Sequence, residues 1–318
     1  MVTIGGLIAL WGLHRDPAGR LRHAGNLAIG TIFLFIWGLS SFGTSISFAF
    51  GDAAVIAVWL VGVAINPLDL TQRAWVSIMA ALGAFIAYVE FLTGQIPLAL
   101  ALLPGMVAIG LKEPTRLGQG RQRVCGGLLA LATGVLTTIL LKQLAVLAVF
   151  GQEAVFSFVS QLGRHTGGPV DIFFSPRELE FLTGLGIGPD SLGGVLASLK
   201  LLVLKFAISS LTIGMGSRIF GVTLIIASII VLAVRLTHVL RSPMPLARGR
   251  GELLLVSLVV LAAWYFAMTT HAIQHSYYMI RPLVWLPVAA VISLLIPTRW
   301  DTIRAAASDA RISTTAVK

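Results

Sequence analysis

Long apolar runs alternate along the chain with short segments that carry most of the charged residues. A helix needs about 20 predominantly apolar residues to cross a bilayer. By that criterion the sequence predicts eight spans, at roughly 24–42, 46–65, 74–92, 95–111, 124–149, 216–234, 252–270 and 281–297. We therefore expect an all-α fold, a polytopic transmembrane helix bundle that forms a single integral membrane domain over residues 1–318.

Two further apolar stretches are less regular. The first thirteen residues are too short to span, and their positive residues follow the apolar run, whereas a signal peptide carries them before it. We interpret this stretch as a truncated N-terminal span. The stretch 193–213 is interrupted by Lys200 and Lys205, so it is either a ninth span or an amphipathic helix in the membrane interface.

The basic residues decide between these topologies. They form four clusters, at Arg15, Arg20 and Arg22; at Lys112, Arg116, Arg121 and Arg123; at Arg235, Arg241, Arg248 and Arg250; and at Arg299, Arg304, Arg311 and Lys318. If 193–213 does not cross, all four fall on one side, which the positive-inside rule favours. The N-terminal basic cluster and the tail 298–318 are then cytoplasmic, and the loop at about 151–193 is outside.

Composition supports the membrane interpretation and excludes several classes of protein. Hydrophobic residues make up 57% of the chain and charged residues 11%, with a mean hydropathy of +0.91. A soluble domain carries about 25% charged residues, so a soluble enzyme, a disordered protein and a nucleic-acid-binding domain are excluded. The net charge of +10 fits basic cytoplasmic loops, and we expect no nucleic-acid partner. The single cysteine, Cys125, excludes an internal disulfide and is expected to be buried.

Ionisable residues within the predicted spans gather at the outer level of the membrane. They are Asp52, Glu90 and Lys142, together with the hairpin that holds His271, His275 and Arg281. Such groups are costly in lipid and tend to face a bundle interior or an aqueous cavity. Each span residue also has a structural interpretation: Asp52 caps a helix, Glu90 is an interfacial acid, and Lys142 extends to the headgroups or pairs with Glu90.

The strongest local signal is the aromatic and basic run from Trp264 to Arg281. If one helix carries both His271 and His275, their i,i+4 spacing puts the two imidazoles on one face, and Tyr278 and Arg281 follow on nearly the same stripe. Paired imidazoles can bind a metal, move protons or hydrogen-bond a phosphate, and the arginine fork suits a phosphate. The chain has no H-E-x-x-H motif, so we predict no cofactor. A divalent metal at the two histidines is an alternative that we do not favour.

Two segments together resemble a known layout: Tyr88-Val89-Glu90-Phe91-Leu92-Thr93 and His271-x-x-x-His275-x-x-x-x-x-Arg281. They are similar to the latter part of bacterial polytopic membrane proteins whose layout is that of the C-type, lipid-linked-sugar glycosyltransferases. The resemblance implies a multi-pass protein of the bacterial plasma membrane, an exterior site, a polyprenyl-phosphate sugar donor and a basic residue that holds the phosphate. It covers about a tenth of the chain.

One departure from that layout matters. Such glycosyltransferases carry a catalytic Asp or Glu in the first outer loop, and the turn from Ser40 to Ser45 has no acid. Either the catalytic part lies outside this chain or the protein does not catalyse the transfer. Whether the protein is an enzyme therefore stays open at this point.

Three functions follow from these residues. In the first, the protein binds or uses a polyprenyl-phosphate-linked sugar at its exterior face, within the membrane lipid. The catalytic candidates are then Glu90, His271 and His275, and the substrate-binding candidates are Arg281, Lys142, Tyr278 and Asp52. In the second, the protein is a transporter or permease in which Asp52, Glu90 and Lys142 form a proton or substrate path. In the third, it is a non-catalytic membrane scaffold.

Overall fold

The protein is described by a computed structural model, which covers residues 46–89, 95–167, 180, 183–184, 218–274 and 281–297. Every regular element in these ranges is a helix, as the sequence predicted. The predicted span 24–42, the stretch 193–213, the first thirteen residues and the tail 298–318 lie outside the described residues. The elements are α3 (Ile46–Ile65), α4 (Gln72–Val89), α5 (Gln95–Gly110), the 3-10 turn η1 (Pro114–Arg116), α6 (Leu117–Phe150), α7 (Gln152–Gly167), α10 (Arg218–Leu240), α11 (Pro245–Ala267), α12 (Thr269–Gln274), the 3-10 turn η4 (Arg281–Val284) and α14 (Trp285–Leu295).

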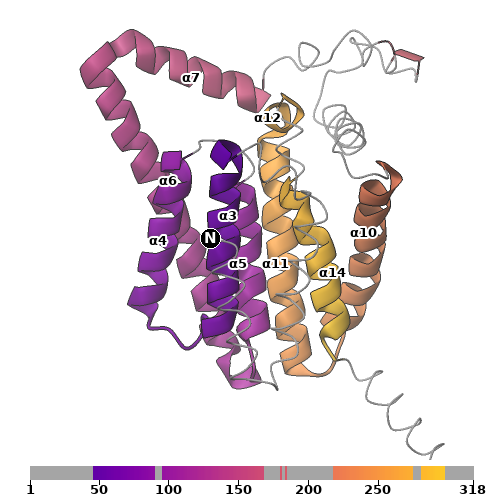
Figure 1. Cartoon of the computed structure of the whole chain (residues 1–318). Helices are drawn as coiled ribbons and strands as arrows, with labels where there is room; N and C mark the ends of the chain where they lie inside the picture. The colour runs from indigo at the N-terminus through magenta and orange to yellow at the C-terminus, as the bar shows by residue number, and fades with distance from the viewer. Residues whose placement is uncertain are drawn as a thin grey trace, which may run out of the picture.

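The long helices lie side by side as a bundle, and α5 is its central helix (Figure 1). Almost every residue of α5 is buried, which explains why its sequence is apolar on all sides. It packs against α3, α6 and α11, while α4 pairs with α6 and α10 pairs with α14. Pro104 lies inside α5, a position that the neighbouring helices of a buried bundle tolerate.

Four described helices are long and apolar enough to cross a membrane: Gln72–Val89, Pro114–Phe150, Thr223–Leu240 and Pro245–Ala267. The apolar segments Ala54–Ile65, Gln95–Gly110 and Pro282–Leu295 are shorter. All seven coincide with predicted spans, so the positions of the apolar helices were predicted well. The predicted number of about eight spans is not reached within the described residues.

Close contact between α4 and α6 depends on glycine. A Cβ atom on Gly83 of α4 would lie 2.1 Å from the backbone oxygen of Leu131, and one on Gly134 of α6 would lie 2.1 Å from the backbone oxygen of Ala80. Each helix therefore places a glycine directly against the backbone of the other. Small residues permit this approach in membrane proteins, where dispersion contacts between helices replace the hydrophobic driving force.

A tryptophan joins the second half of the chain to the central helix. The Trp285 ring lies against Gly105 of α5, where an added Cβ would come within 2.1 Å of the ring. Its indole Nε1 donates a hydrogen bond of 2.8 Å to the hydroxyl of Ser257, on α11, and the ring meets Trp59 of α3 edge to face at 5.5 Å between centroids. Trp285 therefore links α3, α5, α11 and α14.

Three details differ from the expectations. The 34-residue helix α6 begins seven residues before the predicted start at 124, because the basic segment Leu117–Arg123 is itself helical. The loop predicted at 151–193 opens with a helix, α7, rather than with irregular chain. Cys125 was expected to be buried, but it is exposed because it lies on a side of α6 that no described helix covers.

Candidate functional site

The two ends of the bundle differ in how they use their charged residues. We call one end the base: it contains the connections 66–71, 111–116 and 241–244. We call the other the α12 end: there α4 terminates, α6 passes into α7, and α12 lies between α11 and α7 (Figure 1). The chain leaves the bundle at the α12 end after Phe150 and returns there at Arg218. This is the arrangement expected if 193–213 does not cross.

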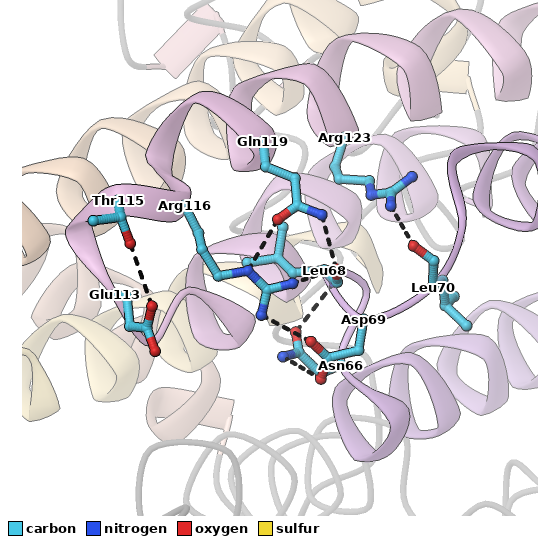
Figure 2. A network of polar contacts seen from close by, with 9 residues as sticks. All are labelled: Asn66, Leu68, Asp69, Leu70, Glu113, Thr115, Arg116, Gln119 and Arg123. Atoms are coloured by element: carbon cyan, nitrogen blue, oxygen red, sulfur yellow. Dashed lines mark hydrogen bonds and ion pairs between the residues drawn. The ribbon is translucent and has the colours of Figure 1, made fainter.

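At the base, one polar network closes the turn between α3 and α4 (Figure 2). Asn66 adopts a positive φ of 67°, a conformation that asparagine tolerates, and its side-chain oxygen accepts a hydrogen bond from the backbone N–H of Leu68. Arg116 donates to the Asp69 carboxylate at 2.8 Å, and Gln119 donates to the Leu68 carbonyl at 2.9 Å. The network ties the α3–α4 turn to the start of α6.

Four other arginines of the base also bind groups of the protein itself. Arg250 donates from two nitrogens to the Leu111 carbonyl, just beyond the end of α5. Arg121 and Arg248 both bind the Glu252 carboxylate, at 2.6 and 3.2 Å. Arg123 donates to the Leu70 carbonyl and the Gln72 side chain. These cations cap helix ends and join connections, which is a structural use.

Lys142 of α6 is a cation with a described side chain close to the α12 end, where α4 terminates. Its ammonium donates hydrogen bonds of 2.8 and 2.7 Å to the carbonyls of Ala87 and Tyr88, in the last turn of α4. It also lies 5.3 Å from the centroid of the Tyr88 ring. The last carbonyls of a helix have no partner within the helix and carry partial negative charge, so an ammonium is stabilised there. Two of its three N–H donors serve this cap.

His271 lies in α12 and is buried, with 2% of its surface exposed. The preceding helix ends at Ala267, Met268 breaks the helical conformation, and the Thr269 hydroxyl donates to the carbonyls of Tyr265 and Phe266. α11 therefore stops before His271, which belongs to the separate six-residue helix α12, while His275 lies outside the described residues. Because α12 packs against α7, the helix that carries His271 is held against the segment that crosses this end.

The remaining predicted residues are only partly located. Asp52 lies in the second turn of α3, at the α12 end, and Arg281 begins η4; the side chains of both are outside the described part. Glu90, His275 and Tyr278 lie outside the described residues altogether. Lys142 contacts α4 whereas the His271 helix packs on α7 and α11, so no direct contact between these two residues is established.

The middle of the bundle carries no Asp, Glu, Lys, Arg or His side chain in the helical stretches 54–65, 74–89, 95–110, 124–141, 219–234, 253–264 and 285–295. Among the described residues there is also no group of three or more His, Cys, Asp or Glu side chains that could hold a metal ion. Chemistry that needs a charged group therefore belongs to the ends of these helices.

No family model, curated protein or solved structure matches this chain. The function is consequently argued from the geometry of the two ends.

Proposed function

We propose that this protein is a polytopic membrane protein that binds a polyprenyl-phosphate-linked sugar at the α12 end of its bundle, which faces the exterior. The observation that carries the proposal is the position of Lys142. Its ammonium is anchored on the last carbonyls of α4, with one N–H donor beyond the two that form the cap. A fixed ammonium at the level where the apolar bundle ends is suited to the phosphate of a lipid.

The concentration of basic residues at the base supports this choice of end. Arg116 and Arg121 pair with carboxylates of the protein, and Arg250 donates to a carbonyl. Cytoplasmic connections of membrane proteins are rich in such residues. The base is then the cytoplasmic face, and the opposite end is the exterior face.

In this proposal the phosphate of the lipid binds Lys142 and Arg281, and its polyprenyl chain remains in the surrounding bilayer. His271, His275 and Glu90 are the candidates to contact the sugar or the acceptor, with Tyr278 and Asp52 near them. Transfer of a sugar needs a base that takes the proton of the acceptor hydroxyl, and neutral imidazole and carboxylate are the groups that serve at neutral pH. We propose this proton transfer from the sequence and from the resemblance.

A transporter is less well supported. A proton path across the bundle needs ionisable groups at several depths. The described helical stretches have none in their middle portions, and Lys142 caps α4 instead of facing another charge across the bundle. We therefore favour binding at one face over conduction between two faces.

The test is binding of polyprenyl phosphate to the purified full chain in detergent, followed by native mass spectrometry. We expect a bound lipid phosphate, with affinity reduced roughly tenfold, or about 1.4 kcal/mol, in Arg281→Gln and in Lys142→Met. Arg241→Gln, an exposed cation at the base, is the matched control and should bind normally. Polyprenol without the phosphate should bind far more weakly to every variant. Equal binding of polyprenol and polyprenyl phosphate, or equal loss in Arg241→Gln, would overturn the proposal.

A further inference from the structure

The helix α7 has two faces of different character. Val155, Phe158 and Val159 share one side of a helix with 3.6 residues per turn, and Glu153 and Ser157 share the opposite side. Phe156 lies at the boundary between the two sides, next to Ser160. Although they are large and apolar, Phe156 and Val159 are 70% and 57% exposed. Glu153 and Ser157, on the polar side, are exposed as well. An amphipathic helix that exposes both faces is typical of a water–lipid boundary.

The apolar side of α7 continues an apolar surface that begins on α6. Leu136 and Leu140 of α6 are exposed, as expected for a membrane-spanning helix in contact with lipid, and exposed apolar residues continue beyond them at Leu144, Leu147 and Phe150. The chain turns at Gly151, whose φ of 80° favours glycine, and α7 then runs across the α12 end (Figure 1). The exposed apolar side chains of the two helices therefore follow one another along the chain.

The length of α6 carries this turn out of the hydrocarbon core on the side of the α12 end. A helix of 34 residues is about 50 Å long, while the hydrocarbon core is about 30 Å thick. If α6 enters the core just after Arg123, it leaves the core at about the level of Lys142, roughly 20 residues later. The last turns of α6 lean away from the bundle in Figure 1, which reduces the height of α7 above that level.

From these observations we infer that α7 lies in the outer membrane interface, with the side of Val155 and Val159 toward lipid chains and the side of Glu153 and Ser157 in water. Its partner is the lipid surface itself. This inference rests on the membrane placement in the proposed function but not on the ligand proposed there. Because α12 packs against α7, the insertion also holds the helix that carries His271.

Spin-label accessibility in liposomes tests this inference. Single cysteines at Val155, Val159, Glu153 and Ser157 are introduced into a Cys125→Ser background and spin-labelled after reconstitution of the full chain. Each label is then measured with oxygen, which concentrates in lipid, and with a water-soluble nickel chelate. We expect several-fold higher oxygen than nickel accessibility at 155 and 159 and the reverse at 153 and 157. High nickel accessibility at all four positions, or protection of 155 and 159 from both reagents, would overturn the inference.

A label at Leu136 of α6, an exposed residue in the middle of the span, distinguishes an error in the position of α7 from an error in the membrane placement of the bundle. If Leu136 shows the lipid pattern but α7 does not, the interfacial position of α7 is wrong and the proposed function stands. If Leu136 is also accessible to nickel, the membrane placement itself fails. A second copy of the chain covering Val155 and Val159 would produce protection from both reagents and a dipolar coupling between labels.

Discussion

Arg121 of α6 and Glu252 of α11 form an ion pair, with 2.6 Å between Nη2 and Oε2, although 131 residues separate them in the chain. The pair brings the second and third basic clusters of the sequence to one end of the bundle. Their shared location is what the positive-inside rule led us to expect when 193–213 does not cross. The pair is therefore more informative about topology than about stability, since exposed ion pairs contribute about 0.2–1 kcal/mol.

Cross-linking checks this relationship. We expect Arg121→Cys and Glu252→Cys, combined in a Cys125→Ser background, to be joined efficiently by a short bifunctional thiol reagent. Protease digestion and mass spectrometry identify the linked peptides. Arg121→Cys combined with Ser157→Cys is the control, because these positions lie at opposite ends of the bundle and should not be linked. Failure of the first pair under conditions that label both thiols would contradict the arrangement of α6 and α11.

Because of the contact between α4 and α6, we expect alanine to change the free energy of unfolding in opposite directions at two glycines of α6. Gly134→Ala puts a methyl group against the Ala80 backbone oxygen, so the helices must separate, and we expect a loss of about 1–3 kcal/mol in the free energy of unfolding. Gly118→Ala meets open space, so only the helix propensity changes, and stability should rise by up to about 1 kcal/mol. Thermal or denaturant unfolding in detergent measures both. A Gly134→Ala protein as stable as the parent would contradict the close approach.

The hydrogen bond between Trp285 and Ser257 is measurable by a double-mutant cycle. Ser257→Ala leaves the buried indole N–H without this acceptor, which should cost about 1–3 kcal/mol. In a Trp285→Phe background that N–H is gone, so the same change should cost about 1 kcal/mol less. The unfolding free energies of the parent, both single variants and the double variant supply the cycle. Additive effects would show that the two groups do not interact.

The apolar pattern predicted the helices better than it predicted their ends. α3 occupies 46–65 as expected, because the apolar run after Asp52 has no competing conformation in lipid. The break at Met268 was missed since no glycine or proline marks it. α7 was missed because its mixed composition resembles a loop when only mean hydropathy is considered, although its period-3.6 alternation was present in the sequence.

Candidate site residues were harder to predict than helices. A basic residue in the sequence indicates which side of the membrane it prefers but not which carbonyl it will cap, so the structural roles of Arg116 and Arg250 were missed. For Lys142 the sequence offered extension to the headgroups or an ion pair with Glu90, which lies outside the described residues, and it gave no sign of the hydrogen bonds to two helix-end carbonyls that the structure shows. Such a contact depends on where α4 ends relative to α6, which is a property of packing.

The cap on α4 predicts that Lys142 contributes to stability as well as to ligand binding. We expect Lys142→Met to lower the free energy of unfolding by about 1–3 kcal/mol, because the Ala87 and Tyr88 carbonyls lose a charged donor. Lys142→Arg keeps a cation and its donors and should lose less. Unfolding in detergent measures the difference. If the two variants are equally stable and both match the parent, the ammonium does not stabilise this end of α4.

The central claim is that the base faces the cytoplasm and the α12 end faces the exterior. Labelling of intact cells with a membrane-impermeant thiol reagent tests it most directly, using Thr115→Cys at the base and Ser157→Cys in α7, each in a Cys125→Ser background; both positions are exposed. The account predicts that Ser157→Cys is labelled in intact cells, whereas Thr115→Cys is labelled only after the membrane is permeabilised. Labelling of Thr115→Cys but not Ser157→Cys in intact cells would reverse the orientation and contradict an exterior binding site.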